Sequence, residues 1–108
     1  MATLTNQNLT DDGVEITTTA ASTTDTFEND GETIVQLENT DASSHDVTFA
    51  AQSPCNMDFL HDRVITVPAT TTITTSMFEK YRFNDDVGEV TIDYGGNEAN
   101  FNVAAIEI

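Results

Sequence analysis

The sequence predicts a small all-β protein: a single-domain antiparallel β-sandwich of jelly-roll-like or immunoglobulin-like type, with seven or eight short strands. Its 108 residues are enough for one domain with one modest core. No window shows the sustained i, i+3, i+4 spacing of apolar residues that a helix requires. Nineteen threonines, together with many valines and isoleucines, favour strands because β-branched side chains fit a pleated sheet.

The expected strands are short runs of alternating apolar and polar residues, each bounded by Asn, Asp, Gly or Pro. In chain order they cover residues 14–16, 33–37, 47–49, 64–67, 71–75, 90–94 and 101–108. Their spacing of about ten residues is typical of a sandwich or a barrel. The predicted sandwich domain spans residues 13–108, and residues 1–12, rich in Asn and Thr, form a candidate extended arm that leaves it.

Three parts of this pattern carry specific expectations. Pro68 interrupts residues 64–75, which are therefore expected to form a hairpin with the proline at its bend. Gly95 and Gly96 predict a tight turn with positive φ. The last strand has apolar residues at both parities, so either both of its faces are covered or a bulge near Ala104 switches them.

The composition is strongly acidic, with 19 Asp and Glu residues against three Lys and Arg and a formal net charge of −16. Such a surface repels nucleic acid and anionic membranes, so neither is an expected partner. At molar salt the Debye length falls to about 3 Å and self-repulsion is screened, which favours a halophilic source. The alternative is an acidic protein of an ordinary organism that uses its charge for solubility. The N-terminal residues lack the features of a signal peptide, and no apolar run has the length of a membrane span.

Residues that commonly carry catalysis or bind metals are few. His45 and His61 are the two histidines, and the Ser and Asp neighbours of His45 form one polar turn, not a triad assembled from separate elements. We therefore expect no enzymatic activity and no cofactor. Asp85, Asp86 and Glu89 surround a glycine but lack the alternating spacing of a calcium loop, so they are weak metal candidates.

The most distinctive segment is residues 80–85 (KYRFND), which interleaves two of the three cations with two aromatic residues. Aromatic residues and arginine are enriched at interface cores, so the segment is a candidate contact with an acidic partner subunit. In the alternative, Tyr81 and Phe83 lie in the core and Arg82 bridges to a nearby carboxylate. Residues 77–83 also depart from strict alternation, which predicts one helical turn or a wide loop. With two leucines of the N-terminal arm added, the candidate interface residues are Leu4, Leu9, Tyr81, Arg82, Phe83 and Asn84.

Several short motifs together resemble a known family. They are residues 26–33 (TFENDGET), 35–39 (VQLEN), 82–85 (RFND), 88–94 (GEVTIDY) and 103–106 (VAAI). The chain resembles small proteins encoded beside the major capsid protein in tailed phages and haloarchaeal tailed viruses, which decorate or stabilise the capsid. Its departure from the bacterial members lies mainly in acids that replace neutral and basic residues.

The resemblance implies a non-enzymatic virion protein on the capsid surface, made in the host cytoplasm and bound to the major capsid protein. It further implies a homo-oligomer around a capsid symmetry axis, with a trimer favoured over a pentamer. Two other classes remain open: another virion part, such as a turret, fibre base or tail component, and a carbohydrate-binding or adhesion module. The absence of Trp and the presence of only two Tyr give the carbohydrate-binding class little support.

Overall fold

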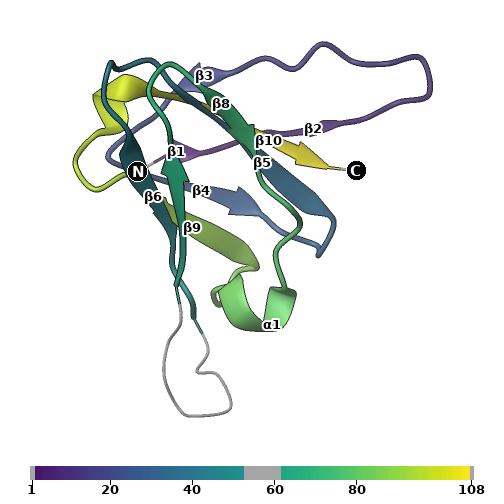
Figure 1. Ribbon diagram of the computed structural model, residues 1–108. Coiled ribbons are helices and arrows are strands. Elements are labelled where there is room, and N and C mark those ends of the chain that lie inside the picture. Colours follow the sequence, from purple (N-terminus) through teal and green to yellow (C-terminus); the bar gives the residue numbers. More distant parts are fainter. Residues whose placement is uncertain (1, 53–61, 108) are drawn as a thin grey trace.

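The computed structural model describes residues 2–52 and 62–107, which form a β-sandwich of two five-stranded sheets (Figure 1). The predicted all-β, single-domain sandwich is thus confirmed. The elements in chain order are β1 (Ala2–Thr3), β2 (Asn6–Asn8), β3 (Thr19–Ala20), β4 (Thr24–Glu28), β5 (Thr33–Asn39), β6 (His45–Phe49), β7 (Arg63–Val67), β8 (Thr72–Thr74), α1 (Lys80–Phe83), β9 (Glu89–Asp93), the 3₁₀ turn η1 (Glu98–Asn100) and β10 (Phe101–Glu107). His61 lies outside the described residues. No described helix is long and apolar enough to cross a membrane.

The two sheets share the chain in an interleaved order. Sheet A has the strand order β1-β4-β9-β6-β7, and sheet B has the order β2-β10-β5-β8 with β3 also paired to β10. Two pairs are parallel, β1 with β4 and β2 with β10, and the other pairs are antiparallel. Consecutive strands often lie in different sheets, so many connections run from one layer of the sandwich to the other.

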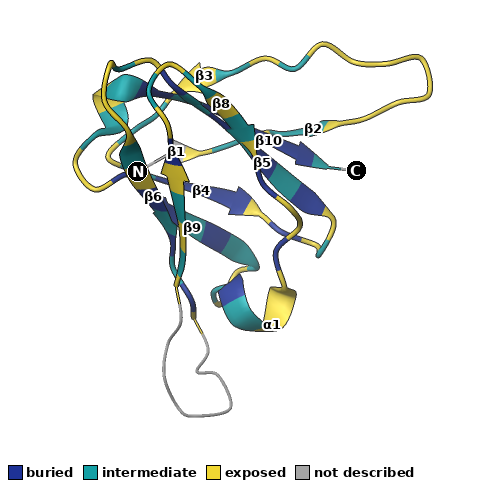
Figure 2. Ribbon diagram, in the orientation of Figure 1, coloured by how far each residue is buried: buried dark blue, intermediate teal, exposed yellow. Residues whose placement is uncertain are grey.

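The core lies between the inner faces of the two sheets, as the alternation predicts. β5 forms a seven-residue antiparallel ladder with β10. Every second residue of β5 from Thr33 to Asn39 is buried (Figure 2). Val90 and Ile92 of β9 are buried in the same manner. Because these two strands alternate between inward-facing and outward-facing residues, the period of two sets which face is buried.

The last strand, β10, has apolar residues on both faces, and the structure decides between a bulge near Ala104 and the covering of both faces. Its ladder with β5 runs unbroken from Phe101 to Glu107, so there is no bulge at Ala104. Both faces are instead covered, since Ala104 and Ile106 are buried as well as Phe101 and the other core residues of the strand. The N-terminal strands β2 and β3 pair along the free edge of β10.

The predicted hairpin across Pro68 is wrong. β7 pairs with β6 in sheet A, whereas β8 pairs with β5 in sheet B, so residues 68–71 form a corner between the sheets. The buried side-chain amide of Asn39 holds this corner, donating to the carbonyl oxygens of Val67 at 3.1 Å and Pro68 at 3.3 Å. Thr70 adopts a positive φ of 51°, which a β-branched residue rarely does outside such a fixed turn.

The turn after β9 is confirmed. Gly95 and Gly96 have φ values of 63° and 85°, a region that glycine enters without a steric penalty. The backbone N–H of Gly95 donates to the Asp93 carboxylate at 2.8 Å, and Asn97 N–H donates to the Tyr94 carbonyl at 3.1 Å. The turn therefore leads from sheet A toward η1 and β10 in sheet B.

The N-terminal region differs from the expectation in two ways. Residues 14–16 are not a strand but part of the loop between β2 and β3, which projects from the sandwich (Figure 1). Within the expected arm, residues 2–8 pair with both sheets, β1 beside β4 and β2 beside β10. The pairing is made by backbone groups, for example from Leu4 N–H to the Thr26 carbonyl at 2.7 Å, and apolar alternation cannot reveal it.

Candidate protein-binding surface at the α1 end

The single turn of α1 is attached to the core through phenylalanine rings. Phe83, in the turn, and Phe78, before it, are buried and lie edge to face with their ring centroids 5.3 Å apart. Phe78 also contacts Phe27 at 5.6 Å and Phe49 at 4.7 Å. A helix of four residues is not stable alone, so these ring contacts determine where the turn lies.

The three cations of the chain come together around this turn. The Arg63 guanidinium lies over the Phe78 ring and the Arg82 guanidinium over the Phe83 ring, each 4.7 Å from the ring centroid. Burial, and next the neighbouring charge of Arg82, lowers the pKa of Arg63. Lys80 belongs to the same turn, and its aliphatic stem lies against Gly31. On a chain of net charge −16, all the Lys and Arg side chains thus lie in one region.

Exposed apolar side chains accompany the cations. Tyr81 of α1 is 77% exposed, Val87 of the following loop is 74% exposed, and Met77 before the turn is also exposed. Figure 2 shows α1 as partly exposed and partly buried. The "α1 end" is the surface formed by Arg63, Met77, Lys80, Tyr81, Arg82 and Val87.

The loop behind α1 is held rigidly by two asparagines. The Asn29 side-chain amide donates to Asn84 Oδ1, and the Asn84 side-chain amide donates to the main-chain carbonyl oxygen of Asn29, both at 2.8 Å. Asn29 also donates to the Phe78 carbonyl at 3.1 Å. The Asn84 side chain therefore makes hydrogen bonds within the molecule that support the turn, and we do not include it in the α1 end.

The acidic loop after α1 is built around Asp85. Its carboxylate accepts the backbone N–H groups of Val87 at 2.9 Å and Glu89 at 3.0 Å, so it organises the loop. Within residues 2–52 and 62–107, no group of three or more His, Cys, Asp or Glu side chains is arranged to hold a metal ion. The weak metal candidates Asp85, Asp86 and Glu89 do not make such a group in this part of the chain.

The structure separates the predicted interface residues into different environments. Tyr81 and Arg82 belong to the α1 end, whereas Phe83 is only 2% exposed and belongs to the core. Leu4 packs against the core from the N-terminal segment. Leu9 is 47% exposed but lies on the projecting loop between β2 and β3, away from α1 (Figure 1).

Several members of the α1 end were not among the predicted interface residues. Arg63 reaches it from β7, and Met77 and Val87 come from the connections on either side of α1. A signal for Arg63 was present, because it is the third of only three cations in an acidic chain. No sequence signal separates Met77 or Val87 from other isolated apolar residues.

Comparisons of the chain with protein-family models, with curated proteins and with solved structures found no match.

Proposed function

We propose that this chain is a non-enzymatic structural subunit that decorates and stabilises the capsid of a halophilic tailed virus, and that it binds the major capsid protein through the α1 end. The observation that carries the proposal is the meeting of all three cations with exposed aromatic and aliphatic side chains in one region of an acidic molecule. The resemblance of the sequence motifs to capsid decoration proteins supports the choice of the major capsid protein as the partner.

The physical case rests on the kind of contact that this surface can make. Stacking on buried phenylalanines orders both guanidinium groups in advance, so less side-chain entropy is lost when a partner binds. Tyr, Met and Arg are enriched in the desolvated centres of interfaces. At molar salt, charge attraction is screened, and the exposed apolar groups supply the larger share of the binding free energy.

The test is co-sedimentation of the purified protein with capsids stripped of it, in molar KCl. We expect saturable binding at a fixed ratio to the major capsid protein. Analytical ultracentrifugation of the free protein then gives its oligomeric state, for which we propose a trimer, with a pentamer as the form suited to five-fold vertices. Absence of binding at any salt concentration contradicts the capsid role and points to a turret, fibre base or tail component.

Two exposed side chains locate the binding surface. Tyr81→Ser should weaken capsid binding by about 30-fold, as expected for an aromatic residue at the centre of an interface. Leu9→Ser, a matched change at the other exposed candidate, should leave binding unchanged. The reverse result would move the contact to the loop between β2 and β3.

Carbohydrate binding is less well supported. Such modules usually present aromatic rings on a sheet face, but the exposed aromatic residue among the described large apolar side chains is Tyr81, which lies on α1. Retention of the protein on immobilised polysaccharide, lost in Tyr81→Ser, would favour that class over the capsid role.

A further inference from the structure

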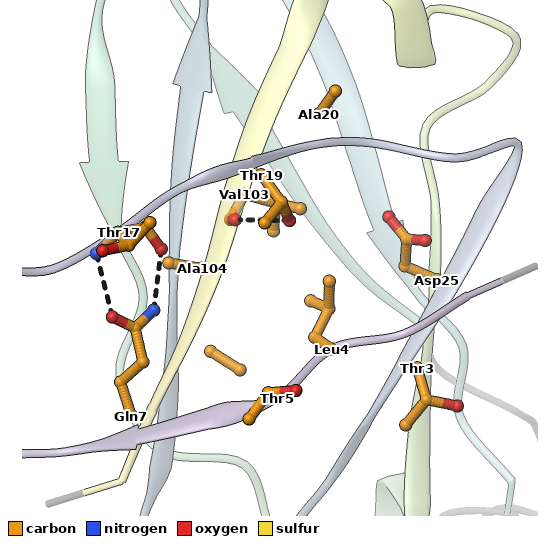
Figure 3. A pocket seen from close by; sticks show the side chains of 11 residues that line it. Thr3, Leu4, Thr5, Gln7, Thr17, Thr19, Ala20, Asp25, Val103 and Ala104 are labelled. Atoms are coloured by element: carbon orange, nitrogen blue, oxygen red, sulfur yellow. Dashed lines mark hydrogen bonds between the residues drawn. The ribbon is translucent and has the colours of Figure 1, made fainter.

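A cavity of about 470 Å³ lies at the edge of β10, on the N-terminal side of the sandwich (Figure 3). β3 pairs with Asn102 and Val103, and β2 pairs with residues 105–107, so Ala104 lies at the gap between the two ladders. The N-terminal segment crosses over this gap on its way between the sheets. The volume is within the range of about 300–1,000 Å³ that is usual for small-molecule sites.

The floor of the cavity is apolar and its margin carries hydroxyl groups. Ala20, Ala104 and Ala105 line it with small side chains, and Leu4 and Val103 add larger ones. Threonines 3, 5, 17 and 19 stand around it, and the Gln7 side-chain amide closes one side by bonding to the backbone of Thr17 at 2.7 and 2.8 Å. A ligand that fits must therefore have a slender apolar body.

One charged group, Asp25, lines the same cavity. This residue is only 1% exposed. Its Oδ2 accepts the Tyr94 hydroxyl at 2.8 Å and the Ser22 N–H at 3.1 Å, whereas Oδ1 is buried with no hydrogen-bond partner among the described residues. A buried carboxylate oxygen without a donor is costly, and a cation with N–H groups would relieve it most effectively. The chain's own Lys and Arg side chains are not available, because all three lie around α1.

We infer that this cavity binds a primary alkylammonium group, with its hydrocarbon chain over the alanine floor and its nitrogen directed to the Asp25 carboxylate. The hydroxyl of Thr3, which stands next to β4 on the Asp25 side of the cavity, can accept one of the remaining N–H bonds of the ammonium (Figure 3). This site is separate from the α1 end and does not depend on the proposed function. The same chemistry has two sources, a free aliphatic amine or the side chain of a lysine on a partner protein.

The test is an NMR titration of the ¹⁵N-labelled full chain with n-butylammonium chloride, at an ionic strength held constant with KCl. We expect amide shifts confined to the cavity, at Leu4, Thr5 and Ala104, and no comparable shifts with n-butanol, the neutral analogue. Asp25→Asn keeps an acceptor for Tyr94 and should weaken butylammonium binding by at least about 10-fold. Asp46→Asn removes the same charge from an exposed position of β6 and should leave binding unchanged.

Three results overturn the inference: equal shifts with butanol and butylammonium, wild-type affinity in Asp25→Asn, or an equal loss in Asp46→Asn, which would show general attraction of cations to an acidic surface. If Asp25→Asn does not fold, Ala104→Val decides, because it narrows the cavity at the gap between the two ladders without changing charge. Binding should be weakened in that variant, and unchanged binding overturns the site.

Titration with N-acetyl-lysine N-methylamide distinguishes the two sources. An affinity close to that of butylammonium means that a lysine side chain carried on a polypeptide backbone can enter the cavity. Binding of butylammonium alone assigns the site to a free aliphatic amine.

Discussion

The α1 end and the N-terminal side of the sandwich are both attached to the core, but by different kinds of interaction. At the α1 end, a segment with almost no ladder pairing is fixed by close contacts among the rings of Phe27, Phe49, Phe78 and Phe83. On the N-terminal side, β1, β2 and β3 are fixed by backbone ladders of two or three residues, and small side chains beneath them leave a cavity. We call β1 to β3 and the cavity that they border the "N-terminal seam".

Strand pairing and side-chain packing are therefore separable in this fold. Large side chains fill space and exclude water at the α1 end, so its outer surface is ordered enough for binding. Backbone pairing alone closes the edge of β10 at the seam but does not fill the space behind it. The charges follow the same division, since cations lie outside on rings at one region and a carboxylate lies inside at the other.

The substitution with the largest expected effect leaves unfilled space at the α1 end, as there is at the N-terminal seam. Phe83→Ala removes a buried ring that contacts Phe78, and we expect a loss of about 3–5 kcal/mol in the free energy of unfolding. Urea unfolding in molar KCl, followed by circular dichroism, measures it. Asn84→Ala should cost less, about 1–3 kcal/mol, because it leaves Asn29 without one partner. Near-wild-type stability in both variants would contradict the ring-based account of the turn.

The second effect tests the buried carboxylate of the seam. Tyr94→Phe removes the hydroxyl that donates to Asp25, and the expected loss is about 1.5–3 kcal/mol because the acceptor is a buried carboxylate. Burial, and next the hydrogen bond to Asp25, raises the pKa of Tyr94, so the phenol remains a donor throughout the usual pH range. The same urea titration measures the loss.

Tyr81→Phe is the control, since that ring is exposed and its hydroxyl removal should change stability by less than about 0.5 kcal/mol. An equal loss of unfolding free energy in the two variants would mean that the hydrogen bond from Tyr94 to Asp25 does not stabilise the fold.

The third substitution adds side-chain packing at the N-terminal seam, as there is at the α1 end. Ala104→Val adds two methyl groups toward the cavity, and we expect a gain of about 0.5–2 kcal/mol in the free energy of unfolding. Thr72→Val, on the exposed strand β8, serves as the control and should be close to neutral. A lower midpoint for Ala104→Val would show that the site is already packed and that the substitution creates strain.

The smallest effect is electrostatic and concerns Glu107, at the end of β10 beside β2. A hydrogen bond with Asp30, and then the like charges of Asp30, Glu32 and Glu28, raise its pKa. A carboxyl group with a raised folded-state pKa stabilises the fold below its unfolded pKa, and this contribution disappears as the pH rises through the folded value. Glu107→Gln should therefore have a higher Tm than the wild type at neutral pH and low salt.

That difference should shrink at acidic pH and in molar KCl, where the charge is neutralised or screened. Thermal unfolding at pH 3.5 and pH 7, each at low and high salt, measures it. Glu15→Gln, on the projecting loop, is the control for net charge and should change Tm less. A rise in Tm that is independent of both pH and salt would contradict the electrostatic cause.

Much of the sandwich was predictable from local pattern. Alternation identified β5, β6, β7, β8, β9 and β10, because one buried face imposes a period of two on the residue types. It missed β1, β2 and β3, which are two or three residues long, carry no large apolar side chain and pair through backbone groups. It also missed β4, where Asp25 and Thr26 are buried beside Phe27. It also suggested a strand at residues 14–16, a run too short to bury a face and without a partner strand.

The candidate surface was predictable only in part. The rarity of cations drew attention to residues 80–85, and Tyr81 and Arg82 do lie at the α1 end. The segment alone did not tell which aromatic ring would be buried, since Tyr81 and Phe83 are two residues apart on a single turn. The surrounding phenylalanines from three other segments decide that Phe83 faces inward.

The amino-acid sequence by itself determined the all-β class, the strands with one apolar face, the glycine turn at residues 95–96 and the acidic character of the surface. These properties depend on single residues or on neighbours within a few positions. Only the tertiary structure decided that Pro68 lies at a corner between sheets, that Arg63 joins Lys80 and Arg82, and that Asp25 borders a cavity. Each of these depends on contacts between segments far apart in the chain, which the packing of two sheets establishes and no local pattern contains.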